Sequence, residues 1–145
     1  MEGKTAKAMA VLPVSFKASV EICSFIRNDT LDAAISKLDR IASGGAAVPY
    51  RKYSVPHKTG MGPGRFPIKA ASAIQRLLVE VKKNASYTGL GDNLVIDKLL
   101  ANKPAKAMHF GRQRRRMKQA RIEVVVREAA EAEKRSKAKG KKEKA

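Results

Sequence analysis

A run of arginines in the last third of the sequence is the strongest candidate for chemistry. The segment 112–116 is arginine at every position except Gln113, and no acidic residue occurs between Lys98 and Arg121. A guanidinium group presents a planar set of donors that can grip a phosphate with two hydrogen bonds and can stack on a nucleobase. The cluster therefore predicts nucleic-acid binding, and the alternative is a localisation signal or a solvated charged run.

Other candidate residues carry weaker signals. The glycine-rich stretch 59–65 superficially suggests a phosphate-binding loop, but its spacing is wrong for a nucleotide-binding motif and no Lys-Ser/Thr pair follows. We interpret it as a flexible loop, which is still compatible with contact to an RNA backbone. His57 and His109 lack the neighbouring Cys or carboxylates that a metal or acid–base site needs. Cys23 fits the apolar face of a helix and is assigned to the core.

Aromatic residues beside cations give a second nucleic-acid signal. His109 and Phe110 are adjacent and could stack on bases, or they could form an exposed turn. Tyr50 and Tyr53 flank a basic pair and could either stack on bases or pack against the protein.

The composition supports this interpretation. The 145 residues include 31 Lys and Arg against 13 Asp and Glu, which gives a formal net charge of +18. Such a field favours polyanions, so nucleic acid is the expected partner and an anionic membrane the second choice. The apolar fraction of 43% allows one core, no apolar run is long enough to span a bilayer, and we expect no signal peptide. A single cysteine excludes an internal disulfide.

Periodicity predicts the elements that position these residues. We expect a strand over 5–12, helices over 15–27 and 31–42, and a third helix from Pro67 to about Lys83 or Ala85. Residues 43–66 are rich in glycine and proline and are predicted to be a long loop. Such a loop in a compact domain is usually functional.

The last third predicts two strands, 94–100 and 120–126. Leu94, Ile96 and Leu100 should share one face of the first, and the even-numbered residues from Ala120 to Val126 should form the apolar face of the second. Pairing even positions with even positions predicts an antiparallel hairpin with its tip at about 108–113. The basic middle of this hairpin has no apolar face to bury, so it needs an external scaffold such as RNA. The tail after it is predicted to be a charged helix or disordered.

Four stretches of the chain together resemble a known family. They are Leu12–Ser19, Val48–Ala71 with its Val-Pro-Tyr-Arg-Lys-Tyr and Gly-Arg-Phe-Pro motifs, Lys83–Ile96, and the basic hairpin closing at Ile122–Val126. The chain resembles the universal protein that lines the exit tunnel of the large ribosomal subunit, numbered twenty-two in the bacterial series and seventeen in the eukaryotic series. Its longer second stretch resembles the archaeal and eukaryotic branch.

The resemblance implies an α+β fold in which a small three-stranded antiparallel sheet is packed by three helices, with a long basic β-hairpin extension and a charged C-terminal tail. It implies one rRNA-binding domain over 1–127, including the 43–66 loop and the 98–121 extension, followed by the tail 128–145. The implied function is a structural constituent of the large subunit that binds its rRNA, supports assembly and contributes to the tunnel wall. No enzyme activity, cofactor or metal is implied.

The implied partners are rRNA, neighbouring large-subunit proteins and the nascent polypeptide. No membrane partner or homo-oligomer is expected, and the location is the cytoplasm, in the ribosome. The residues that the resemblance assigns to rRNA binding are Lys17, Arg51, Lys52, Arg65, Lys69, Lys83, Lys98, Lys103, Lys106, Arg114, Arg115, Arg116, Lys118 and Arg121. Those assigned to the tunnel-facing tip are Met108, His109, Phe110, Gly111, Arg112 and Gln113. This tip departs from the usual Pro-Arg-Ala-x-Gly-Arg pattern of the family and is several residues shorter.

Two other classes remain as rivals. A free regulator or chromatin-like DNA-binding protein would share the basic charge, although no helix-turn-helix or dimer seam is evident. An RNA-modifying enzyme would need an acid, base, metal or cofactor site, and the sequence offers none that we can identify.

Overall fold

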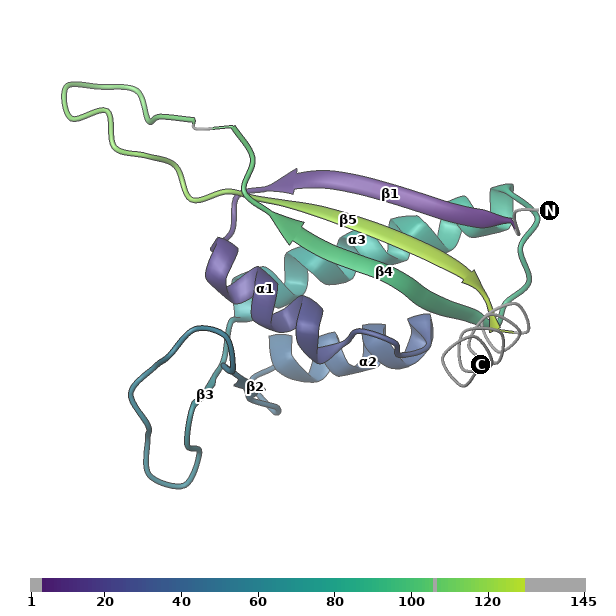
Figure 1. Ribbon diagram of the computed structural model, residues 1–145, viewed down its shortest axis with the longest axis horizontal. Helices are drawn as coiled ribbons and strands as arrows, with labels where there is room; N and C mark the ends of the chain where they lie inside the picture. Colours follow the sequence, from purple (N-terminus) through teal and green to yellow (C-terminus); the bar gives the residue numbers. More distant parts are fainter. Residues whose placement is uncertain (1–3, 106, 130–145) are drawn as a thin grey trace, which may run out of the picture.

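The computed structural model describes residues 4–105 and 107–129, and it has the predicted α+β architecture. Lys106 and most of the predicted tail, residues 130–145, lie outside the described part. The chain order places one strand before the helices and two strands after them (Figure 1). The elements are β1 (Thr5–Leu12), α1 (Phe16–Phe25), α2 (Leu31–Ala42), β2 (Val48–Pro49), β3 (Gly64–Arg65), α3 (Ile68–Tyr87), β4 (Leu94–Asn102) and β5 (Ala120–Glu128).

The sheet has the order β1-β5-β4, and both pairings are antiparallel. Ala120, Ile122, Val124 and Val126 alternate along the central strand and are all buried, as their spacing predicts. α3 packs against β1 and β5, α1 packs against β4 and β5, and α2 packs against α3. The helices therefore bury one face of the sheet, and the other face carries exposed side chains such as Met9 and Val11.

A β-bulge in β4 overturns the predicted strand register. The pairing shifts between Ile96, opposite Val126, and Lys98, opposite Val125, so odd positions of β4 meet even positions of β5 beyond this point. As a result Leu99 is buried, at 1% exposure, whereas Leu100, which we predicted on the apolar face, is 43% exposed.

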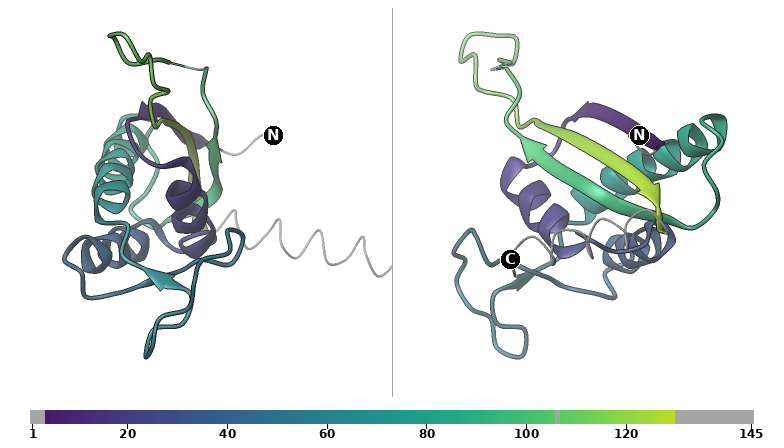
Figure 2. Two further views of the ribbon diagram at one scale, coloured as in Figure 1. Left: turned by 90° about the vertical axis from the view of Figure 1, so that its left-hand side faces the viewer. Right: turned by 45° about the vertical axis from the view of Figure 1, so that its right-hand side comes forward.

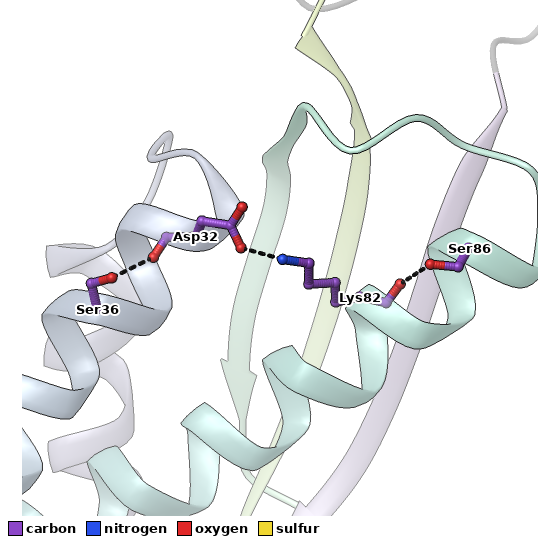
Figure 3. A network of polar contacts seen from close by, with 4 residues as sticks. All are labelled: Asp32, Ser36, Lys82 and Ser86. Atoms are coloured by element: carbon purple, nitrogen blue, oxygen red, sulfur yellow. Dashed lines mark hydrogen bonds and ion pairs between the residues drawn. The ribbon is translucent and has the colours of Figure 1, made fainter.

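The helices begin and end close to their predicted bounds, with one exception. α2 coincides with its prediction, and α1 is two residues shorter at its C-terminal end. α3 continues to Tyr87, beyond the predicted end at Lys83 or Ala85, so Lys82 lies inside the helix and not in its last turn. Lys82 instead forms an ion pair with Asp32 of α2 at 2.7 Å, which joins the two helices (Figure 3). That partner also raises the pKa of Lys82, first through the hydrogen bond and then through its charge.

The long loop between α2 and α3 is more ordered than predicted. β2 and β3 form a two-residue antiparallel ribbon, and Tyr50 N–H extends it by donating to the Pro63 carbonyl at 3.1 Å. A tight turn between Lys58 and Gly62 closes the far end. The prediction of an unstructured loop is therefore wrong at its base, where backbone pairing brings residues distant in sequence together.

The segment 103–119 connects β4 and β5 and protrudes from the body (Figure 1). Within its described residues, the only β-bridge joins Met108 and Arg116, and His109 N–H donates to the Arg115 carbonyl at 2.7 Å. The chain reverses between these residues, at Gly111, whose φ of 111° suits glycine. β5 itself ends at Glu128, inside the segment that we predicted to be tail. No helix in the described ranges is long and apolar enough to cross a membrane.

Candidate nucleic-acid interface

Two basic segments project from the same end of the molecule. The first is the loop 50–66, and the second is the segment 103–119, which we call the arm. Figure 1 shows both at the left-hand side: the arm lies above, where β4 ends and β5 begins, and the loop lies below α1. In the left view of Figure 2 the two segments point away from each other, with α1 between them. Two basic segments that are far apart in the sequence therefore flank α1.

Aromatic and cationic side chains connect α1 to both segments. The rings of Phe16 and Tyr53 meet edge to face, with centroids 6.4 Å apart. Lys103 Nζ, at the base of the arm, lies 5.2 Å from the centroid of the Phe16 ring, and Lys17 Nζ lies 5.5 Å from that of Tyr53. Cation–π attraction holds each ammonium group over its ring and leaves its charge available. The structure thus brings Lys17 and Lys103 to neighbouring aromatic rings.

The loop backbone is fixed by a buried carboxylate that we did not predict from the sequence. Glu21 of α1 is 2% exposed, and its two oxygens accept hydrogen bonds from the N–H groups of residues 51, 52 and 53 at 2.8 to 3.1 Å. The side chains of Arg51 and Lys52 are exposed. The only signal in the sequence was that no other acidic residue occurs between Glu2 and Asp29.

Arg65, which we predicted to bind rRNA, is also engaged inside the protein. Its guanidinium donates to the carbonyls of Gly64 and Pro56, each at 2.6 Å. These bonds hold the two sides of the loop together and occupy part of its donor set. Tyr50 is half-buried against the core, which supports the packing alternative for this residue. Burial raises its pKa, the Glu21 charge adds to the rise, and the Arg65 charge opposes it.

Five cations of the arm have no charge partner in the described part of the chain. The side chains of Arg112, Arg114, Arg115, Arg116 and Lys118 are exposed, and none forms an ion pair with any residue of the described ranges. Lys69, in the first turn of α3, lines the same hollow as Arg115 and Lys118 at the base of the arm. This hollow adds a third element to the interface.

The tip of the arm is open. Met108, His109, Phe110 and Arg112 surround a shallow hollow, and the Phe110 ring is fully exposed. An aromatic ring in water beside several guanidinium groups has no partner in the described chain. Such a ring suits stacking on a base or contact with a peptide.

Three of the residues predicted to bind rRNA lie away from the cations of α1, the loop and the arm. Lys83 is in the C-terminal half of α3, and Lys98 is on the exposed face of the sheet. Arg121 pairs with Glu123 at 2.8 Å on that face, and its Nε lies 3.0 Å from Met9 Sδ. Lys106 lies outside the described residues, so the structure does not place it.

The remaining candidates for chemistry take no part in the cluster. Cys23 is buried in the core, as predicted, and burial raises its pKa to about 12, so the thiol is not a nucleophile at neutral pH. His57 is exposed in the loop. In the part of the chain that the structure describes, no three His, Cys, Asp or Glu side chains gather as a metal site would require.

Comparison with known proteins gives one consistent result. Residues 8–127 match the family model described as ribosomal protein L22p/L17e. A protein of Thermoplasma acidophilum is 43% identical over 107 residues, covering 71% of each chain. Proteins of Picrophilus torridus and Methanoculleus marisnigri are 37% and 40% identical over 128 and 131 residues, covering 83% and 82% of this chain and 86% of each relative. All three relatives are named large ribosomal subunit protein uL22.

Proposed function

The chain belongs to the ribosomal protein L22p/L17e family, and on that premise we propose that its loop and arm bind large-subunit rRNA while the tip of the arm reaches the polypeptide exit tunnel. Membership makes the chain a structural constituent of the large ribosomal subunit and not an enzyme. It associates there with rRNA and with other subunit proteins. The proposal concerns how its residues do so.

One observation carries the proposal: the arm is a protruding segment of exposed cations with no charge partner among the described residues. Like charges concentrated on a segment with little backbone pairing repel one another. A dense array of phosphates removes this repulsion and releases counterions, which favours binding. We therefore expect the arm to be stabilised by binding to RNA.

The predicted rRNA-binding residues differ in whether their side-chain donors are free to contact RNA. The cluster that we propose contacts rRNA directly consists of Lys17, Arg51, Lys52, Lys69, Lys103, Arg114, Arg115, Arg116 and Lys118. Arg65 and Arg121 have donors already bonded within the protein, so we assign them a smaller share. Lys83 and Lys98 would contact rRNA on other faces, and Lys106 completes the predicted set.

At the tip, we assign Met108, His109, Phe110, Gly111, Arg112 and Gln113 to the tunnel wall, where the nascent polypeptide passes. Domain organisation follows from the same proposal. Residues 1–127 act as one rRNA-binding domain, with the loop and the arm as its extensions, and the tail follows. The chain works as a single copy in the subunit.

Incorporation into ribosomes tests this proposal. A tagged chain is expressed in a related archaeon, and lysates are sedimented through a gradient after a high-salt wash. We expect the wild-type chain to sediment with the large subunit and to be released by extensive ribonuclease digestion. We expect R114Q/R115Q/R116Q to be depleted from the subunit. A matched control, R27Q/R40Q/R76Q, removes the same charge from exposed positions on the body of the protein and should incorporate normally. Equal incorporation of both variants would refute the role of the arm.

A further inference from the structure

Glu21 is a buried carboxyl group whose oxygens are bonded to the backbone of the loop. It lies on α1 among core residues, and its carboxylate oxygens accept from Arg51 N–H at 3.1 Å, Lys52 N–H at 2.9 Å and Tyr53 N–H at 2.8 Å. A buried carboxylate is costly unless it is well hydrogen-bonded. An apolar residue of similar size could fill the same space, so the specific gain from Glu21 lies in the backbone that it holds.

Three consecutive N–H groups that converge on one anion define the local backbone. Such an arrangement is a nest, which in other proteins binds phosphate or another anion. Here the protein supplies the anion itself. With its N–H groups turned inward to Glu21, the segment leaves the side chains of Arg51 and Lys52 exposed on the surface.

We propose that Glu21 is a positioning residue, which orders residues 51–53 before RNA binds so that Arg51 and Lys52 act together with the cations of the arm. This inference rests on the proposed rRNA binding and adds the device that prepares the loop for it. Ordering a flexible segment on binding lowers affinity, and the cost of fixing even one residue corresponds to about a tenfold change. A loop ordered in advance avoids that loss.

The same helix also contacts the arm. Phe16, in the first turn of α1, meets the Tyr53 ring and lies under Lys103 Nζ, 5.2 Å from the ring centroid. The loop and the arm are thus held from one short helix. When two binding elements are fixed relative to one another, the first contact raises the effective concentration of the second. We therefore expect the RNA contacts of loop and arm to be coupled through α1.

Hydrogen exchange on the free, full-length chain tests the ordering step without RNA. Glu21→Gln keeps the size of the side chain but replaces one acceptor oxygen by a donor that faces N–H groups. We expect the amides of residues 51–53 to exchange at least about tenfold faster, while the amides of β5 keep their protection. Glu80→Gln, at an exposed position of α3, is the control of equal charge and should change neither. Unchanged exchange at 51–53 in the Glu21 variant would overturn the proposal.

A second variant covers the case in which Glu21→Gln does not fold. Glu21→Asp keeps the charge but is shorter by one methylene, so it cannot reach all three amides with the present geometry. We expect a partial loss of protection at 51–53. Full protection in this variant would contradict the role of the three bonds.

RNA binding then separates this inference from the proposed function. We compare the loss of affinity for deproteinised large-subunit rRNA caused by R51Q/K52Q in the wild-type and Glu21→Gln backgrounds. We expect a loss of about tenfold or more in the wild type and a clearly smaller one in the variant. Equal losses in both backgrounds would overturn the positioning role and leave rRNA binding by the loop intact. No loss in either background would refute rRNA binding by the loop, whatever the exchange data show.

Discussion

The salt dependence of RNA binding should report the cations of the arm directly. Arg114, Arg115 and Arg116 are exposed and unpaired within the described chain, so each is free to neutralise a phosphate. Each neutralised phosphate contributes about 0.7 to 0.9 to the slope of log K against log salt concentration. Replacing all three with glutamine should therefore reduce that slope by about 2 to 3. Between 50 and 200 mM salt, the wild type should lose about 15- to 60-fold more affinity than the variant.

The assay is filter binding of the purified chain to deproteinised large-subunit rRNA over a series of potassium chloride concentrations. The control R27Q/R40Q/R76Q lowers the net charge by the same amount at exposed positions outside the loop and the arm. Its slope should stay within about one of the wild-type slope. If both variants lowered the slope equally, net charge rather than the arm would drive binding. If the arm variant kept the wild-type slope, these arginines would not contact phosphates.

Two further predictions concern the body of the protein. The bulge buries Leu99 and exposes Leu100. In urea denaturation, Leu99→Ala should therefore lower the free energy of unfolding by about 2–5 kcal/mol, and Leu100→Ala should lower it by less than about 1 kcal/mol. The reverse ranking would contradict the strand register. Because burial raises the pKa of Cys23 to about 12 from 9.0, the folded thiol should resist Ellman's reagent at pH 8 and react after denaturation. The unfolded thiol loses its proton at lower pH than the folded one, so the stability of the wild type relative to Cys23→Ala should be constant below pH 9 and fall between pH 9 and 12. A difference that stayed flat over this range would show that the thiol is not desolvated.

The elements with clear periodicity were predictable from the sequence. Alternation from Ala120 to Val126 identified the buried face of the central strand, and helical spacing identified α2 with its observed bounds. These patterns succeed because each residue buries its side chain against the same core. The arm was predictable for the opposite reason, since its dense cations and the absence of a regular apolar pattern exclude it from any core.

The corrections arise from interactions between distant residues. The bulge beside Asp97 places Arg127 within 2.7 Å of its carboxylate, but alternation alone cannot reveal which residue a strand will leave unpaired. The bond between Glu21 and the loop joins residues about thirty positions apart. The ion pair between Lys82 and Asp32 is likewise long-range, because it forms only once α2 and α3 have packed together.

Position-specific crosslinking in ribosomes tests the central claim most directly. A photoreactive phenylalanine analogue is placed at Phe110, at the exposed tip of the arm, and in a second strain at Tyr87, at the C-terminal end of α3. Irradiation of salt-washed large subunits and of subunits carrying a stalled nascent chain is followed by digestion and sequencing of the crosslinked partners. We expect position 110 to crosslink to large-subunit rRNA and to the nascent chain, and position 87 not to reach the nascent chain. The contrary result would be that position 110 crosslinks to neither rRNA nor the nascent chain, although the strain with the analogue at position 87 shows that the protein is present in the subunits. That result would contradict the proposed place of the arm.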